Sequence, residues 1–378
     1  MASVDYPKEF KGFAVQTPSE WNKPKLTSYA PKTMGDHDVD IEIECCGVCA
    51  SDLFTARAGW ATNWDKKGSP QVVGHEIVGK VVAIGSKVTS VKLGERVGQG
   101  AQASSCLSCS RCNKDNEQYC PGMVGTYDSY YPDGYLSQGG YASHVRANEH
   151  FIFPIPQGIK SSEAAPLMCG GLTVFSPLKR NGCKPGAKVG IIGIGGLGHM
   201  AIMIAKALMT DDNNKFDGEI YAFSRTFSKK QHALEMGATH FIATAEKNWH
   251  VPLFDKFDVI INCASSVQSL DINAFLSTLG VEKKFVTVGL PDEHEKYDVS
   301  PKSFFKNGSY LSSACLGSRE EALELLQLAV KHNIKPWVEE IPLSEAGCHS
   351  AMSRCWDGDC RYRFTLTKFN EFFNTGKN

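Results

Sequence analysis

Short apolar runs separated by glycine-containing turns dominate the first part of the chain, up to about residue 160. They include VDIEIECCG, QVVGHEIVGKVVAIG and GERVGQG. Runs of this length, rich in Val and Ile and bounded by turn residues, are typical of β-strands with tight connections. The pattern therefore predicts a β-rich lobe.

The pattern changes after about residue 163, where apolar runs alternate with helical segments. KVGIIGIG is typical of a buried strand and GLGHMAIMIAKALM of an apolar helix. The alternation continues through EIYAFS, FSKKQHALEMG, HFIAT, FDVIINCA, KKFVTVGL and SYLSSACLG. This texture predicts βαβ units and a parallel sheet. SREEALELLQLAVKHN predicts an amphipathic helix with Leu323, Leu326, Ala329 and Val330 on its apolar stripe. The segment RYRFTLTKF predicts a last strand that returns to the first lobe.

Length and charge narrow the class of protein. A chain of 378 residues exceeds the size at which single cores stop growing, so two domains are expected. The net charge of -1 argues against a nucleic-acid or anionic-membrane partner, and no apolar stretch is long enough to predict a membrane span. The opening MASVDYPKEFKGFAVQ contains no apolar run typical of a secretory signal, which predicts a cytoplasmic protein. Its fourteen cysteines then read as thiols, metal ligands or core residues.

The segment GIGGLG fits the dinucleotide-binding pattern G-x-G-x-x-G. It follows a predicted strand and opens a predicted helix, which is the context the pattern requires. Glycines allow a tight turn there, and the helix N-terminus presents N–H groups to a pyrophosphate. A tight turn without a ligand is the alternative. The predicted cofactor-binding residues are Gly193, Gly195, Gly196, Leu197 and Gly198.

The end of the second strand indicates which dinucleotide binds. No carboxylate stands there to accept hydrogen bonds from a ribose 2′-hydroxyl, and a polar insertion at 210–218 delays the strand. Ser224, Arg225, Lys229 and Lys230 instead suit a 2′-phosphate, which favours NADP(H). A solvated basic turn at the start of a helix is the alternative.

Two groups of metal-ligand residues stand out. Cys106, Cys109, Cys112 and Cys120 follow C-x2-C-x2-C-x7-C, and four thiolates can close the tetrahedral shell of a structural zinc. An iron–sulfur cluster or free thiols are the alternatives, although the last spacing is longer than the three residues of the C-x2-C-x2-C-x3-C-P run. The second group is dispersed. Two cysteines and one histidine leave an open position on a catalytic zinc, whereas buried cysteines are often plain core. These three residues are Cys49, His75 and Cys169.

Six motifs, taken in order, resemble the zinc-dependent medium-chain alcohol dehydrogenases. They are GVCASD, GHEIVGKVVAIG, KLGERVG, the four-cysteine segment, CGGLTV and GIGGLG. A further set of segments is similar to those of the NADP-dependent cinnamyl-alcohol-dehydrogenase branch: DNEQYC, GGYASHVRANEHF, PLKRNG and GDCRYRFTL. The resemblance implies an α/β fold with a GroES-like β-rich catalytic domain (1–162 and 314–378). A Rossmann NADP-binding domain (163–313) lies between these segments, and the protein is expected to be a homodimer.

The resemblance also implies a role for each site residue. Cys49, His75 and Cys169 would bind the catalytic zinc, which Glu76 can join transiently, and the four-cysteine group would bind a second zinc. Asp52 would fix the imidazole of His75. The same resemblance implies that Ser51 hydrogen-bonds the reacting oxygen and that Thr173 lies near the nicotinamide.

These roles imply interconversion of primary alcohols and aldehydes (cinnamyl, aromatic or medium-chain aliphatic) by hydride transfer. Zinc would polarise the carbonyl oxygen and Ser51 would supply the proton. Phe54 stands where the family commonly has a proton-relaying histidine. Phe54, Trp60 and Tyr127 could line an apolar substrate pocket, or simply pack locally.

Three rival interpretations remain. One is an NAD-dependent polyol or simple-alcohol dehydrogenase of the same fold, against which Ser224 and Arg225 argue. Another is a zinc-ribbon module that binds nucleic acid or protein, which the near-neutral charge disfavours. The third is a catalytically silent relative, which the complete set of Cys49, His75 and Cys169 disfavours.

Overall fold

A computed structural model describes residues 7–60, 64, 70–268 and 270–374. The chain divides into two compact units. Unit 1 comprises Met1–Cys169, Ser318–Val330 and Lys335–Asn378, and unit 2 comprises Gly170–Gly317 and Lys331–Ile334. The sequence predicts domain boundaries at 162/163 and 313/314, and these boundaries stay a prediction.

The core of unit 1 is built on β3 (Asp38–Val48), whose apolar side chains are almost fully buried. This strand lies inside a seven-stranded sheet ordered β10-β6-β5-β3-β18-β17, and β9 also pairs with β3. The register of β3 against β5 places Gly47 opposite Glu76, so the ends of two glycine-flanked motifs meet. Its other strands are β5 (Glu76–Ile84), β6 (Arg96–Gln99), β9 (His144–Asn148), β10 (Ile152–Pro154), β17 (Val338–Pro342) and β18 (Arg363–Thr367).

Two smaller sheets complete the β-structure of unit 1. One has the order β2-β1-β4 and the other is the antiparallel pair β7-β8, which flanks the four-cysteine segment. Short helices α1 (Ala50–Ala56) and α3 (Ser161–Ala164) follow β3 and β10 in the chain. The strands are β1 (Phe10–Val15), β2 (Lys25–Tyr29), β4 (Gln71–Val72), β7 (Gln102–Ser104) and β8 (Val124–Gly125).

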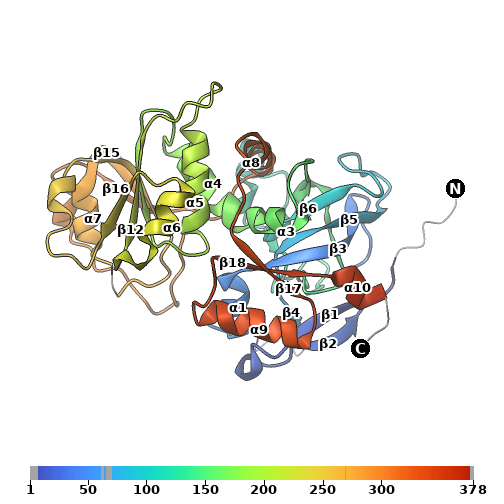
Figure 1. Cartoon of the computed structure of the whole chain (residues 1–378). Helices are drawn as coiled ribbons and strands as arrows, with labels where there is room; N and C mark the ends of the chain where they lie inside the picture. The colour runs from blue at the N-terminus through green and yellow to red at the C-terminus, as the bar shows by residue number, and fades with distance from the viewer. Residues whose placement is uncertain (1–6, 61–63, 65–69, 269, 375–378) are drawn as a thin grey trace. The chain divides into compact units, whose positions relative to one another are not determined.

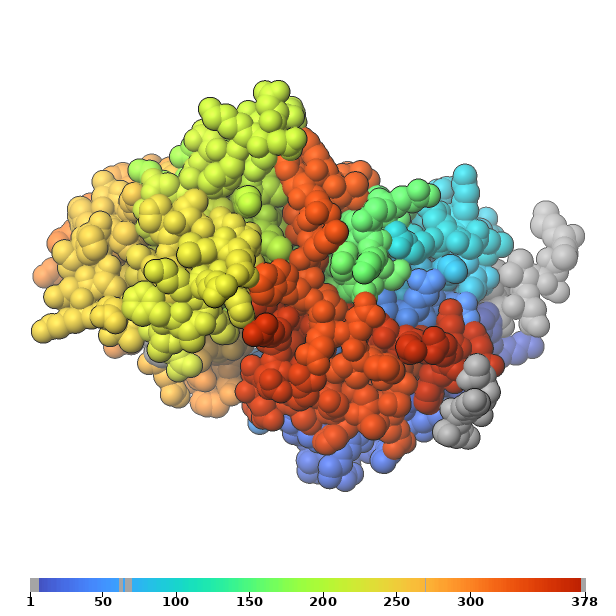
Figure 2. All heavy atoms as spheres, in the orientation of Figure 1, coloured from blue at the N-terminus to red at the C-terminus, as the bar shows by residue number. Residues whose placement is uncertain are grey.

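The C-terminal segment returns to unit 1, as predicted from RYRFTLTKF. Strand β18 pairs antiparallel with β3 and parallel with β17. Helices α9 (Glu345–Trp356) and α10 (Phe369–Asn374) accompany it, and this segment forms much of the visible face of unit 1, in orange and red (Figure 2).

Helix α8 (Arg319–Lys331) also confirms a sequence prediction, with a correction to its apolar face. It buries Ala322, Leu325, Leu326 and Ala329, whereas Val330 is 39% exposed. Of the four residues predicted for the stripe, only Leu326 and Ala329 are buried, whereas Leu323 is half-buried and Val330 is exposed, because Ala322 and Leu325 take the buried positions.

Unit 2 contains six parallel strands in the order β13-β12-β11-β14-β15-β16 (Figure 1). This is the doubly wound order of a dinucleotide-binding Rossmann sheet, and the strand order reverses beside β11. The strands are β11 (Lys188–Ile192), β12 (Glu219–Ser224), β13 (His240–Ala243), β14 (Phe257–Asn262), β15 (Leu279–Thr287) and β16 (Tyr310–Ser313). The helices are α4 (Gly170–Arg180), α5 (Gly198–Leu208), α6 (Lys230–Met236) and α7 (Ile272–Thr278).

The insertion at 210–218 connects α5 to β12 as an exposed loop. It is closed by an antiparallel bridge between Thr210 and Phe216, and the Asp211 side chain accepts hydrogen bonds from the N–H groups of Asn213 and Lys215. Among the described residues, every helix is too short or too polar to cross a lipid bilayer.

Candidate active site

Cys49 stands between β3 and α1, where the chain turns into the helix. The Asp52 carboxylate accepts a hydrogen bond from the Cys49 N–H at 2.9 Å, and the Asp52 N–H donates to the Cys49 carbonyl at 3.0 Å. This reciprocal pair fixes the turn. The Ser51 hydroxyl lies 3.7 Å from the Cys49 sulfur, so both predicted site residues face the same place.

His75 is held by a turn that requires glycine. Gly74 has φ +101°, and a Cβ there would lie 2.5 Å from the ring of Tyr141. The Gly74 N–H donates to Asp52 Oδ1 at 3.2 Å, which ties this turn to the one at Cys49. His75 Nδ1 then lies 3.1 Å from Asp52 Oδ1, as predicted for the residue that fixes the imidazole.

The structure brings together the four residues predicted around the catalytic metal. One ligand atom each of Cys49, His75, Glu76 and Cys169 lies within 4.8 Å of the other three, and all four residues are buried. His75 Nε2 is 3.1 Å from the Cys169 sulfur. A hydrogen bond from Cys169 lowers the pKa of the Cys49 thiol well below its ordinary value. Two sulfurs, one imidazole and one carboxylate form a donor set that suits Zn²⁺.

Arg363 on β18 is a site residue that the sequence did not reveal. Its guanidinium forms a buried ion pair with Glu76, which has 0% exposed surface. Burial raises the pKa of Glu76 to about 7, against the opposing charge of Arg363. The only sequence signal was an arginine at the start of an apolar strand, and nothing local connected it with Glu76.

The four cysteines of the second group also converge. Sulfur–sulfur distances are 3.4 Å for Cys106–Cys120, 3.6 Å for Cys109–Cys112 and 3.9 Å for Cys109–Cys120. The N–H groups of Ser108 and Cys109 lower the pKa of Cys106 to about 6, which favours its thiolate. Four sulfurs at these distances match a closed tetrahedral metal site.

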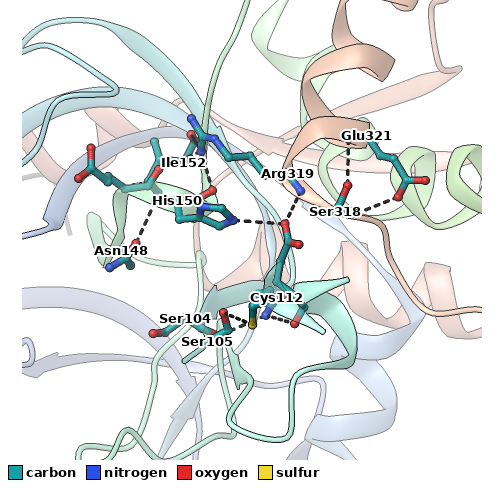
Figure 3. Close-up of polar contacts among 12 residues, drawn as sticks. Ser104, Ser105, Cys112, Asn148, His150, Ile152, Ser318, Arg319 and Glu321 are labelled. Atoms are coloured by element: carbon teal, nitrogen blue, oxygen red, sulfur yellow. Dashed lines mark hydrogen bonds and ion pairs between the residues drawn. The ribbon is translucent and has the colours of Figure 1, made fainter. Parts of the chain in front are cut away.

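A partly buried polar network attaches this lobe to α8 (Figure 3). Glu117 lies between the third and fourth cysteines, and its Oε1 is 3.3 Å from His150 Nε2 and accepts the Arg319 N–H at 2.6 Å. The Arg319 guanidinium donates to the carbonyls of Glu149, His150 and Ile152 at 2.5 to 3.0 Å. The lobe and the start of α8 are therefore one rigid assembly within unit 1.

The three aromatic residues predicted for the substrate pocket do not form a single cluster. Phe54 stacks on Trp60, with ring centroids 4.9 Å apart and planes 1° from parallel, and Trp356 from α9 meets Phe54 edge-on. Tyr127 does not join these stacked rings. Its hydroxyl lies 2.8 Å from His75 Nδ1, and its place in an apolar substrate pocket stays a prediction.

The glycine-rich turn of unit 2 has the geometry of a dinucleotide loop. Gly193 has φ +82°, and a Cβ at Gly198 would lie 2.0 Å from the Gly193 carbonyl, so the helix can start only with glycine there. A Cβ at Gly195 would contact nothing within 4 Å, which leaves its surroundings open. Gly196 and Leu197 complete the turn before α5.

The basic residues predicted for the cofactor lie next to this turn. Ser224 ends β12 and Arg225 follows it, exposed to solvent. Lys229 extends to the turn itself, where its Nζ donates to the Ile194 carbonyl at 2.7 Å. Thr173 lies separately, on α4, and is 8% exposed.

A doubly wound sheet with a glycine-rich turn, in one chain with a buried zinc-type donor set, defines the class of zinc-dependent nicotinamide oxidoreductases. The model of the alcohol dehydrogenase GroES-like domain matches residues 35–157, and that of the zinc-binding dehydrogenases matches residues 196–331. The chain belongs to the zinc-binding alcohol dehydrogenase family.

Individual relatives agree with this assignment. The NADP-dependent alcohol dehydrogenase 6 of Saccharomyces cerevisiae is 48% identical over 98% of this chain and 100% of its own length. A cinnamyl alcohol dehydrogenase from Sorghum bicolor has a TM-score of 0.86 at 28% identity, covering 95% of this chain and 98% of that one. The CAD from Helicobacter pylori, solved with NADP(H), has a TM-score of 0.83 at 30% identity, with the same coverage.

Proposed function

We propose that the enzyme interconverts primary alcohols and aldehydes by hydride transfer between the substrate and NADP(H). The observation that supports this most directly is the convergence of Cys49, His75, Glu76 and Cys169 in one buried place. These residues would hold a zinc, which would supply Lewis-acid polarisation of the carbonyl oxygen, and bound NADPH would supply the hydride. The donor set fits zinc because two thiols and an imidazole are its preferred ligands.

The chain's own residues hold and move the proton. Ser51, in the first turn of α1 beside Cys49, donates its hydroxyl proton to the reacting oxygen during aldehyde reduction and takes it back during alcohol oxidation. Phe54 cannot relay this proton onward, so exchange with solvent passes through water or a ribose hydroxyl. Asp52 keeps the His75 ring in place. The ion pair with Arg363 offsets the charge of Glu76, and the Glu76 carboxylate would be able to join the metal ligands transiently.

The NADP(H) preference rests on the basic turn after β12. Arg225 and Ser224 offer a guanidinium and a hydroxyl to the 2′-phosphate, and Lys229 adds a further cation beside the glycine-rich turn. The yeast relative is named as NADP-dependent, which supports the same preference. The backbone N–H groups at the start of α5 would bind the pyrophosphate, and Thr173 would lie near the nicotinamide.

The substrate class that we propose is aromatic and medium-chain aldehydes and their alcohols. The stacked pair Phe54–Trp60 offers a flat apolar surface, and the sorghum relative is named as a cinnamyl alcohol dehydrogenase.

We further propose two zincs per chain, the second one structural and bound by the four-cysteine lobe. Units 1 and 2 would then correspond to the catalytic and the NADP-binding domain, although the units change at 169/170 and 317/318 and the predicted domains at 162/163 and 313/314. None of the fourteen cysteines is paired in a disulfide, which is compatible with the proposed cytoplasmic location.

A homodimer is also proposed. Strand β16 is the last in the order of its sheet, and edge strands readily pair with another chain. Apolar side chains in this part of unit 2 are exposed, among them Phe305 at 85%. Light scattering after gel filtration would give twice the chain mass.

The test of the function combines a metal count with an NADPH-oxidation screen. Purified protein should contain two zincs per chain and reduce cinnamaldehyde and benzaldehyde with NADPH at least about tenfold more efficiently than with NADH. Equal efficiency with both cofactors, or oxidation of polyols with NAD⁺ in preference, would favour an NAD-dependent dehydrogenase of the same fold instead.

A further inference from the structure

Tyr127 connects the four-cysteine lobe with the catalytic histidine. It follows β8, the strand that pairs with β7 and closes the lobe, by two residues. Its hydroxyl oxygen lies 2.8 Å from His75 Nδ1, and the two ring centroids are 5.2 Å apart. The contact joins side chains 52 positions apart in the sequence.

The tautomer of His75 follows from what surrounds its two nitrogens. Nε2 lies 3.1 Å from the Cys169 sulfur, in the group of ligand atoms that face one another. A nitrogen that binds a metal must present its lone pair, so the ring hydrogen resides on Nδ1. That hydrogen needs an acceptor, and Nδ1 faces two of them: Asp52 Oδ1 at 3.1 Å and the Tyr127 oxygen at 2.8 Å.

Asp52 already accepts from three other segments. Its Oδ2 receives the Cys49 N–H at 2.9 Å and the Tyr141 hydroxyl at 3.1 Å, and its Oδ1 receives the Gly74 N–H at 3.2 Å. Asp52 therefore organises the turns of the site, while Tyr127 offers His75 the shorter contact. A phenol is neutral at neutral pH and can accept through its oxygen while donating its own hydrogen.

We propose that Tyr127 is a positioning residue for the catalytic metal: its hydroxyl accepts the His75 Nδ1 hydrogen and, with Asp52, fixes the plane of the imidazole. This inference rests on the proposed zinc at Cys49, His75 and Cys169. It also gives the four-cysteine lobe a route to the active site, because Tyr127 stands two residues after the strand that closes the lobe. Partners of a ligating histidine typically change metal affinity or activity by about 10- to 100-fold.

The test is the rate at which each zinc is lost to excess chelator in Tyr127→Phe, followed with a metal-sensitive dye. The phase that is missing in Cys49→Ser belongs to the catalytic zinc. That phase should accelerate at least about tenfold in Tyr127→Phe, while the other phase keeps its wild-type rate. kcat for aldehyde reduction should fall, with KM for NADPH unchanged. Tyr131→Phe is the matched control, since it removes a hydroxyl from the same loop but its ring contacts Lys32 and Tyr135.

Three outcomes would overturn the inference. The first is a wild-type rate of zinc release in Tyr127→Phe, and the second is equal acceleration of both phases, which would indicate a general loss of stability. The third is a change in KM for the aldehyde alone, which would return Tyr127 to the substrate pocket. A wild-type protein without any phase that depends on Cys49 would instead remove the proposed catalytic zinc itself, and with it this inference.

Discussion

Arg225 is the residue on which the cofactor preference depends most. It is exposed directly after β12, so it can form two charge-assisted hydrogen bonds with a 2′-phosphate. Such bonds contribute about 1.5–3 kcal/mol, so Arg225→Ala should raise KM for NADPH by about 10- to 100-fold. KM for NADH should change by less than about threefold.

The matched control is Lys215→Ala, which removes an exposed cation from the 210–218 insertion. Steady-state kinetics with both cofactors should leave it at wild-type values. Equal losses for NADPH and NADH in Arg225→Ala would mean that the residue does not recognise the phosphate.

Glu149 predicts a pH dependence of stability. Its carboxylate accepts the N–H groups of Thr89 and Ser90 at 2.9 Å and contacts His37 Nδ1 at 2.7 Å. Burial opposes ionisation, but these hydrogen bonds prevail and lower the pKa of Glu149 to about 2. The stabilisation is therefore complete above the ordinary carboxyl pKa of about 4.3 and is lost as pH falls from there toward 2.

Glu149→Gln should accordingly reduce the free energy of unfolding by about 1 kcal/mol at pH 7, after allowance for solvent screening. The difference from the wild type should shrink below about pH 4.3. Urea denaturation at pH 7 and at about pH 3, between the unfolded and the folded pKa of Glu149, measures it, with exposed Glu20→Gln as the control. A difference that does not depend on pH would show that the charge of Glu149 is irrelevant.

At the scale of elements, the attachment of α8 to the four-cysteine lobe is the most testable contact. Arg319→Met removes the guanidinium that donates to three part-buried carbonyls (Figure 3), of which that of Glu149 keeps the Ile152 N–H, and should lower the free energy of unfolding by about 2 kcal/mol. Lys331→Met, at the other end of the same helix, loses only a surface pair with Asp212 and should cost less than about 0.5 kcal/mol. Similar values for the two variants in denaturant titrations would contradict the rigid attachment.

Elements with a strong local pattern could be predicted from the sequence. The alternation of strands and helices in unit 2, the GIGGLG turn and the strand RYRFTLTKF were all expected, because apolar runs and glycine act over a few residues. Helix α9 escaped prediction, since EAGCHSAMSRCW mixes small and polar residues without a clear apolar stripe. The error at Val330 has the same origin, because burial on α8 depends on what packs against it.

Long-range pairings could not be predicted in this way. Arg363 meets Glu76 across 287 positions, and Tyr141 meets Asp52 across 89. No local pattern encodes which distant strand returns to which neighbour. The spacing of the four-cysteine group was enough to predict a zinc site, whereas the dispersed ligands Cys49, His75 and Cys169 became specific only through the resemblance to a known family. The contact of Tyr127 with His75 emerged only in three dimensions.

For the whole molecule, a Cys→Ser substitution should affect activity at one proposed metal site and stability at the other. Cys49→Ser should retain one zinc per chain, lose activity by more than about 1,000-fold and unfold within about 2 °C of the wild type, since the open site adds little to stability. Cys106→Ser should also retain one zinc but unfold at least about 5 °C lower, because the metal replaces an apolar core in that lobe.

Elemental analysis with calorimetry tests this pair of predictions, and Cys315→Ser, an exposed cysteine outside both groups, is the control. Two variants with the same metal content, activity and melting temperature would show that the sites do not differ in role.

The position of β18 between β3 and β17 has a consequence for biosynthesis. On the ribosome, β3 is made some 320 residues before β18, and no earlier segment can take the place of β18 against Val48 and Cys46. The nascent chain must therefore carry an open strand edge while the whole of unit 2 is translated and folds, and such edges invite pairing with other chains. The metal-binding half of this enzyme is thus the last to mature, and truncations that remove β18 should be cleared by quality control rather than accumulate as partial enzymes.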